Sequence, residues 1–178
     1  QRSDTHSYTC FHRAPTQLAA LTGPVLAHLG LDRVPGGAQG QPLRVLLYAC
    51  SNGAEAYTWS AWLALQRPDL EVVIEASDLS PELISRARAG RYTWSELTQD
   101  GEVPAWLVEQ TFDRAGEDYV VNERTRRRVS FSCADIIRDD LRARYGQADL
   151  VVAQNVLFHL PPPLARRALP CGLSLIHI

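Results

Sequence analysis

Short apolar runs alternate with helix-like segments along most of this chain. The runs lie at residues 43–49, 71–76, 129–133 and 149–153. Mostly apolar runs of this length predict strands that are buried on both faces, as in a parallel sheet. Because parallel strands need crossover connections, the pattern predicts an α/β fold with a parallel-sheet core.

Segments with apolar residues at helical spacing lie before and between these runs. One covers residues 16–29, where Pro24 predicts a kink or a break. A second covers residues 55–66, and a third begins after Ser80, whose side chain suits an N-cap, and ends before Gly90. Shorter helical pieces are expected at residues 141–145 and 161–169.

Residues 91–128 interrupt this alternation. They mix aromatic and polar side chains and predict a helix near residues 104–112 and a strand pair flanking Gly116. Four strands are fewer than a finished doubly wound sheet contains, so we expect the chain to stop before its last strands. The expected organisation is a helical lead-in and linker at 1–41, a partial ligand-binding domain at 42–169, and a non-native or truncated tail at 170–178.

Composition argues against several classes of function. The formal net charge is −2, which argues against a nucleic-acid-binding or membrane-surface protein. No apolar run approaches the roughly 20 residues of a membrane helix, so we expect no membrane insertion and a cytoplasmic protein. The four cysteines form no C-x-x-C pair, so we expect buried thiols and no metal site.

The loop after the first predicted strand is the first candidate for ligand binding. It runs from Cys50 through Ser51 to Gly53, and ligands of open α/β sheets bind at the carboxyl ends of the strands. A dinucleotide needs several glycines there for its pyrophosphate, whereas S-adenosylmethionine has no phosphate and needs less clearance. A plain strand-to-helix turn is the alternative.

Two acidic residues follow the next strands. Asp78 lies about 25 positions beyond Gly53, where a carboxylate can accept hydrogen bonds from ribose hydroxyls, or it helps to cap the helix that follows. Asp135 follows the third strand and either reaches an adenine amino group or is a solvated loop carboxylate. Asn155 follows the fourth strand and faces the same crevice. His159 lies just beyond, although a lone histidine is more often a packing or surface residue.

A run of arginines precedes the third predicted strand. Arg124, Arg126, Arg127 and Arg128 form either a docking patch for an anionic partner or a solvated strand edge, where charge also guards against aggregation.

Several segments, in order, resemble motifs of the CheR family of protein-glutamate methyltransferases. TCFHR at residues 9–13 resembles the family's threonine-x-phenylalanine-phenylalanine-arginine motif, and CSNGAEAYT at residues 50–58 resembles its glycine loop. The other resembling segments are ASDLS at 76–80, ARAGRY at 87–92, the insert through Tyr119 with residues 128–131, and NVLFHL at 155–160.

The resemblance implies a Rossmann-like class I methyltransferase fold and S-adenosylmethionine as the cofactor. It implies methylation of glutamate carboxylates in chemotaxis receptors or related signalling proteins, with receptor cytoplasmic helices as partners. The catalytic residues would be Arg13, near the transferred methyl group, and His159, where the family has a tyrosine. The cofactor-binding residues would be Thr9, Arg13, Cys50, Ser51, Gly53, Glu55, Asp78, Asp135, Ile136, Gln154, Asn155 and Val156.

The chain departs from the family pattern in this region. Ala54 replaces a glutamate, Asp135 an asparagine, Gln154 an arginine and His159 a tyrosine. These differences leave two alternatives open: a non-catalytic S-adenosylmethionine-binding signalling module, and a methyltransferase of the same fold with a small-molecule acceptor. A dinucleotide-binding enzyme is a third alternative, against which the single glycine of the loop argues.

Overall fold

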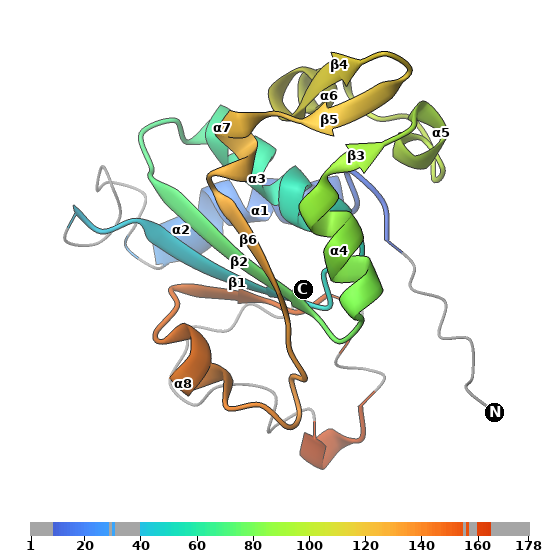
Figure 1. Ribbon diagram of the computed structural model, residues 1–178. Helices are drawn as coiled ribbons and strands as arrows, with labels where there is room; N and C mark the ends of the chain where they lie inside the picture. The colour runs from blue at the N-terminus through green and yellow to red at the C-terminus, as the bar shows by residue number, and fades with distance from the viewer. Residues whose placement is uncertain (1–8, 29, 31–39, 155, 157–159, 165–178) are drawn as a thin grey trace.

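The computed structural model describes residues 9–28, 30, 40–154, 156 and 160–164, and a parallel sheet lies at its centre (Figure 1). Neighbouring strands pair in parallel, with Leu47 of the central strand opposite Ala76 on one side and Val152 on the other. Within the described residues the sheet has four strands in the order β6-β2-β1-β7: β1 (Leu43–Tyr48), β2 (Val72–Asp78), β6 (Val129–Cys133) and β7 (Leu150–Val152). The predicted α/β fold with a parallel-sheet core is therefore confirmed.

Helices cover both faces of this sheet because its strands are apolar on both faces. α3 (Ala54–Gln66) and α4 (Pro81–Ala89) pack on one face, and α8 (Leu141–Tyr145) packs on the other (Figure 1). Alternate residues of β1 supply the two cores: Leu43, Val45 and Leu47 face α3, and Leu46 and Tyr48 face α8. As predicted, the Ser80 hydroxyl caps α4, where it accepts the N–H of Leu83 at 3.3 Å.

The N-terminal helical segment is bent where the sequence predicts. α1 (Pro15–Ala20) continues into the wider turn η1 (Leu21–Val25) and then α2 (Leu26–His28), and Gly23 and Pro24 lie inside that turn. The backbone of Gly23 is not helical, with φ −102° and ψ −105°. None of the helices described by the structure is long and apolar enough to cross a membrane.

The segment between α4 and β6, called the insert (residues 91–128), forms a second sheet. In the described chain this sheet is antiparallel with three strands, ordered β3-β5-β4: β3 (Arg91–Tyr92), β4 (Phe112–Ala115) and β5 (Asp118–Val121). Its helices are α5 (Trp94–Leu97), α6 (Ala105–Thr111) and α7 (Glu123–Arg126). The predicted helix and hairpin are confirmed, whereas β3, α5 and α7 are too short for a hydrophobic period to reveal them.

Two local expectations change. β2 continues two residues beyond the predicted end, because Ser77 and Asp78 pair with Ser132 and Cys133 of β6. Asp78 is therefore the last residue of a strand and not part of the loop. Cys133 is exposed, contrary to the prediction of buried thiols, because it ends β6, an outer strand of the sheet; Cys10 and Cys50 are buried as predicted.

Candidate functional site

The β1–α3 loop has an unusual backbone at the carboxyl edge of the sheet. Ala49 and Ser51 have φ values of 54° and 50°, a left-handed conformation that residues other than glycine rarely adopt. Cys50 lies between them and is completely buried, and its N–H donates to the carbonyl of Ser77 at 3.0 Å. Burial raises the pKa of the Cys50 thiol, so this group stays protonated and supports packing rather than nucleophilic chemistry.

Gly53 ends this loop with φ 91°, and the space around its Cα is already filled. A Cβ at this position would lie 3.0 Å from the Cβ of Ala87 and 3.1 Å from the ring of Phe131. The structure thus gives the glycine a packing reason, the close approach of the loop to α4 and β6. The sequence suggested either a ligand-binding glycine or a plain strand-to-helix turn, and it gave no sign of this packing.

Asp78 links two loops at the edge of the sheet. One carboxylate oxygen accepts the N–H of Ser51 at 2.8 Å, and the other accepts the N–H of Ser80 at 3.0 Å. The carboxylate therefore shapes both the β1–α3 loop and the turn into α4. Each carboxylate oxygen has a second lone pair, so acceptor capacity remains for a hydroxyl donor.

Glu55 is a buried acid in the first turn of α3. Its residue exposure is 8%, and the indole Nε1 of Trp59 donates to it at 3.4 Å. Burial raises the pKa of the Glu55 carboxyl to about 7, although the Trp59 hydrogen bond and the positive charge of Arg13 act in the opposite direction. A buried acid with a raised pKa and a charged neighbour is a candidate for a functional group.

The segment Thr9–Arg13 lies beside α3. This segment and the β1–α3 loop are called the two walls of the candidate site. The N–H of His12 donates to the Thr58 hydroxyl at 3.2 Å, and Phe11 is buried in the main core. Burial raises the pKa of both Cys10 and Glu55, and Arg13 lies close enough to both groups for its charge to act in the opposite direction. The structure thus brings together predicted site residues that are about 40 positions apart in sequence.

Asp135 makes local contacts in the loop after β6. One oxygen accepts the N–H groups of Ile137 at 2.9 Å and Arg138 at 3.2 Å, and the other lies 3.6 Å from the exposed guanidinium of Arg138. Ile136 packs against the core on the α8 face. These contacts favour a loop carboxylate that binds its own loop. A role for Asp135 in binding adenine stays a prediction.

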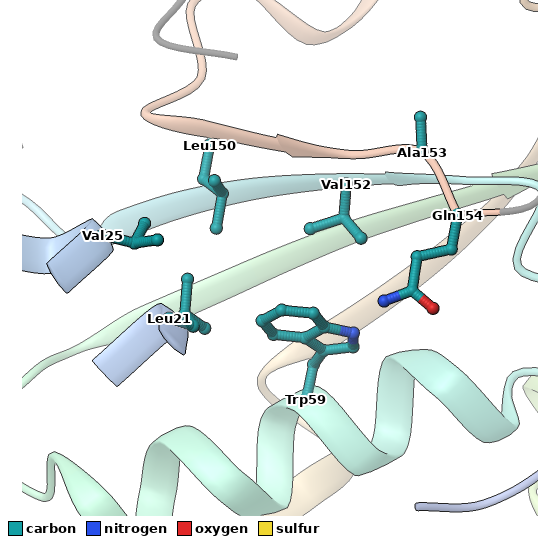
Figure 2. Close-up of a pocket in the computed structure, with 7 residues that line it drawn as sticks. All are labelled: Leu21, Val25, Trp59, Leu150, Val152, Ala153 and Gln154. Carbon is teal, nitrogen blue, oxygen red and sulfur yellow. The ribbon is translucent and has the colours of Figure 1, made fainter. Parts of the chain in front are cut away.

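Gln154 turns toward the helices rather than along the edge of the sheet. Its amide donates to the side chain of Gln17 in α1, and in Figure 2 it extends toward the ring of Trp59. Gln154 and Trp59 line a cavity of about 10 Å³, room for about one water molecule. The apolar residues Leu21, Val25, Leu150, Val152 and Ala153 complete the lining. Val156 is half-buried, and Asn155 and His159 lie outside the described residues.

The four arginines of the run have different surroundings. Arg126 donates to the carbonyl oxygens of Arg88, Ala89 and Val121, and so ties α7 to the end of α4. Arg127 pairs with Glu123, and Arg124 binds Gln110. Arg124, Arg127 and Arg128 nevertheless line one surface hollow together with Glu71 and Glu123. A docking role for these three arginines stays a prediction.

Side-chain chemistry at this edge fits a zwitterionic nucleoside cofactor. Arg13 and Glu55 offer opposite charges for an amino-acid group, and Asp78 offers acceptors for ribose hydroxyls. The loop has one glycine and no phosphate cradle. In the part of the chain that the structure describes, no group of three or more His, Cys, Asp or Glu side chains is placed to hold a metal ion. The fold and site therefore define an α/β ligand-binding domain whose candidate site lies at the carboxyl ends of its parallel strands.

Comparison with protein families identifies the domain more closely. Residues 7–169 match the family described as CheR methyltransferase, SAM binding domain. The chain belongs to this family, and its cofactor is S-adenosylmethionine. The family resemblance, the Rossmann-like methyltransferase fold and the cofactor predicted from the sequence are thereby confirmed.

Similar proteins are methyltransferases named for biofilm formation or chemotaxis. The probable biofilm formation methyltransferase WspC of Pseudomonas aeruginosa is 30% identical over 158 residues, which cover 87% of this chain and 35% of that protein. WspC of Pseudomonas putida is 29% identical over 95% of the chain and 38% of its own length. Chemotaxis protein methyltransferase 1 of P. aeruginosa is 30% identical over 71% of the chain and 47% of its own length. The chain spans less than half the length of each of these relatives.

The structure also shows supporting residues that the site prediction did not include. Thr58, Tyr92 and Gln99 hydrogen-bond to the backbone of the two walls of the site. Thr58 and Tyr92 lie within motifs that resemble the family, so the sequence contained a signal for them. Gln99 lies in an irregular stretch, and no pattern marks it.

Proposed function

We propose that this domain transfers the methyl group of S-adenosylmethionine to glutamate carboxylates of chemotaxis receptors or related signalling proteins. The proposal rests on two observations in a domain of the CheR family: Glu55 lies near the charge of Arg13, and Asp78 holds the β1–α3 loop at the carboxyl edge of the sheet. The names of the relatives refer to chemotaxis and biofilm formation, which favours a signalling protein as the acceptor. If the acceptor is the cytoplasmic part of a receptor, the enzyme acts in the cytoplasm.

In this proposal the cofactor lies between the two walls. Asp78 accepts hydrogen bonds from the ribose, and Arg13 and Glu55 orient the amino-acid end. Asp135 and Ile136 lie at the adenine end. The remaining predicted contacts come from Thr9, Cys50, Ser51, Gly53, Gln154, Asn155 and Val156.

The proposed reaction needs no acid–base catalysis by the protein. The cofactor supplies an activated methyl group on a sulfonium. A glutamate carboxylate is already ionised at neutral pH, so no general base is needed. The protein contributes orientation: Arg13 holds the acceptor carboxylate or the methyl-bearing end of the cofactor, and His159 donates a hydrogen bond there.

The cofactor part is tested by titration calorimetry of the full-length protein with S-adenosylhomocysteine, with NAD as the control. Micromolar binding of the first ligand and none of the second is the expected result. The acceptor part is tested by transfer of labelled methyl groups to receptor cytoplasmic fragments. No binding of S-adenosylhomocysteine to folded protein would contradict the first part, and no receptor methylation by cofactor-binding protein would contradict the second.

Gln154 favours a second candidate function. The family pattern has an arginine in place of Gln154, whose amide contacts Gln17 in α1. Ala54 likewise stands where the family has a glutamate. These differences favour either a non-catalytic cofactor-binding module or a methyltransferase with a small-molecule acceptor. Binding without turnover on receptor fragments or on a panel of small carboxylates indicates the module, whereas turnover on the panel alone indicates the small-molecule enzyme.

A further inference from the structure

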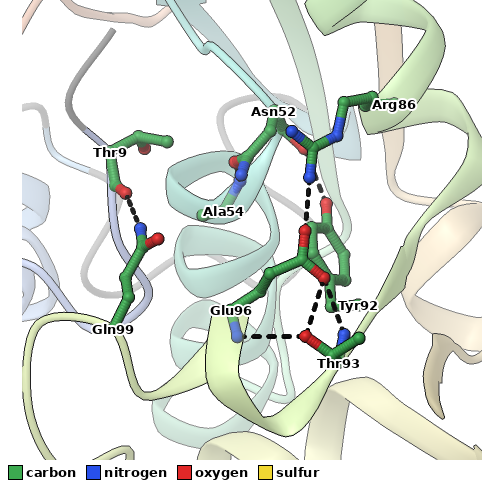
Figure 3. Close-up of polar contacts among 8 residues, drawn as sticks. All are labelled: Thr9, Asn52, Ala54, Arg86, Tyr92, Thr93, Glu96 and Gln99. Carbon is green, nitrogen blue, oxygen red and sulfur yellow. Dashed lines mark hydrogen bonds and ion pairs between the residues drawn. The ribbon is translucent and has the colours of Figure 1, made fainter. Parts of the chain in front are cut away.

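The insert contacts both walls of the candidate cofactor pocket. One wall is the β1–α3 loop, which includes Asn52, and the other is the segment Thr9–Arg13. Figure 3 shows a side chain of the insert reaching each wall, Tyr92 toward Asn52 and Gln99 toward Thr9. The insert therefore lies where it can set the distance between the walls.

Tyr92 holds the loop wall. Its hydroxyl donates to the carbonyl oxygen of Asn52 at 2.6 Å, and the residue is 1% exposed. Burial raises the pKa of this hydroxyl well above its usual value, so the group keeps the proton that it donates. The Asn52 side chain in turn accepts the N–H of Ala54 at 3.1 Å, which connects the contact to the start of α3.

Gln99 and its neighbour hold the other wall. The Gln99 amide donates to the carbonyl oxygen of Thr9 at 2.6 Å, and Asp100 hydrogen-bonds to the thiol of Cys10. The ring of Phe11 meets the ring of Tyr92 edge-on, with centroids 5.0 Å apart. Three consecutive residues of this wall are thus fixed by the insert.

The base of the insert is itself held firmly. Thr93 and Glu96 form a reciprocal capping box at the start of α5, and Glu96 also pairs with Arg86 of α4 (Figure 3). Tyr92 directly precedes this box, and Gln99 follows α5 by two residues. Both side chains therefore project from a short segment of backbone that the box and the ion pair hold in place. Fixed donors lose little entropy when they hold a partner.

We propose that Tyr92 and Gln99 are positioning residues of the cofactor pocket, through which the insert sets the spacing of its two walls. The inference rests on the proposed cofactor binding between these walls. Neither residue needs to touch the cofactor, because each acts on it through the backbone of a wall.

The first test compares two tyrosines. Tyr57 is as buried as Tyr92, and its hydroxyl also donates to a carbonyl oxygen at 2.6 Å, but the acceptor is Ala87 in α4. In the full-length protein we expect Tyr92→Phe to raise the Kd for S-adenosylhomocysteine three- to tenfold, the size of one hydrogen bond. Tyr57→Phe should leave the Kd within about twofold at a similar loss of thermal stability. Equal shifts in Kd for both variants, or none for Tyr92→Phe, would overturn the role of Tyr92.

The second test uses the exposed Gln99. Gln99→Glu places a carboxylate against the Thr9 carbonyl, and Gln66→Glu at the exposed end of α3 adds the same charge elsewhere. We expect weaker cofactor binding in the first variant and unchanged binding in the second. An unchanged Kd for Gln99→Glu would remove Gln99 from the proposal.

Amide hydrogen exchange of the ligand-free protein tests the walls without the cofactor. Peptides covering residues 9–14 should exchange faster in Gln99→Glu, and those covering 49–54 faster in Tyr92→Phe, while the control variants match the wild type. Unchanged exchange in both walls would overturn the inference even if the wild type binds cofactor. Failure of the wild type to bind S-adenosylhomocysteine would instead contradict the proposed function, and exchange would still decide the positioning role.

Discussion

At the scale of single residues, burial and backbone conformation determine what the site side chains can do. Asp78 uses its carboxylate to hold two loops, and Gly53 is packed on the side where a Cβ would project. Burial raises the pKa of the Glu55 carboxyl to about 7, so its charged and neutral forms both occur near physiological pH. Substitutions at Glu55, Gly53 and Arg13 test what single residues contribute to stability and to methyl transfer.

Glu55 makes stability depend on pH. The pKa of its carboxyl is about 7 in the folded protein and 4.5 as its ordinary value, so the folded state binds more protons between these two pH values. The free energy of unfolding therefore falls as the pH rises through this window. At pH 8 we expect the free energy of unfolding of Glu55→Gln, measured by urea unfolding, to exceed that of the wild type by up to about 3 kcal/mol. Near pH 5 this difference should disappear. The control is Glu109→Gln on the exposed surface of α6, and an advantage equal at both pH values would contradict the prediction.

Gly53→Ala tests the packing reason for the loop glycine. The new Cβ meets Ala87 and Phe131 at about 3 Å, and φ is 91°, so we expect a loss of about 2 kcal/mol or more of unfolding free energy. Gly116 also has a positive φ, but nothing lies within 4 Å of a Cβ there. Gly116→Ala should therefore cost about 1 kcal/mol. Equal losses in urea unfolding would show that packing at Gly53 is unimportant.

Arg13→Ala tests the proposed catalytic arginine. Loss of a group that orients a reactant should reduce methyl transfer by a factor of about 100 or more, with thermal unfolding unchanged within a few degrees. Arg91→Ala on β3 removes an exposed arginine as the control. Normal methyl transfer in Arg13→Ala would exclude this role.

At the scale of elements, α4 and α7 are joined through backbone carbonyls. The guanidinium of Arg126 binds Arg88 and Ala89 at the C-terminal end of α4, where a cation is favourable. It also binds the carbonyl oxygen of Val121 at the end of β5. One side chain therefore closes the insert onto the main domain.

The last arginine of α7, Arg126, and the next residue, Arg127, allow a matched experiment on this junction. Arg126→Leu removes hydrogen bonds to three carbonyl groups, and we expect a loss of about 2 kcal/mol or more. Arg127 is mostly exposed and pairs with Glu123 one helical turn away, so Arg127→Leu should cost less than about 0.5 kcal/mol. Urea unfolding of both variants measures the difference, and similar losses would argue against a closing role for Arg126.

At the scale of the whole molecule, cofactor binding should couple to folding. The two walls come from residues 9–13 and 49–53, which lie together only in the folded chain. A ligand that binds the folded state alone, at 100 times its Kd, adds about 2.7 kcal/mol. For a domain of this size the unfolding midpoint should rise by about 5–10 °C with S-adenosylhomocysteine and stay unchanged with NAD. Equal shifts with both ligands would contradict the assigned cofactor.

The alternation of apolar runs and helical segments predicted the main sheet and its helices within a few residues. Such patterns work because a strand buried on both faces must be apolar throughout, and Pro24 and Ser80 mark local geometry by their own chemistry. The insert was harder to predict. Its two-residue strand β3 is defined by pairing with Val120 and Tyr119, and no local pattern encodes such a pairing.

The sequence by itself determined the fold class, the order of the main-sheet strands and their crossover helices along the chain, and the family, because these follow from local patterns and short motifs. The tertiary structure alone decided how the candidate site is held together. Asp78 reaches Ser51 across 27 positions, Tyr92 reaches Asn52 across 40, and Gln99 reaches Thr9 across 90. Contacts at such separations depend on how the crossover helices and the insert pack, and packing is a property of the whole chain.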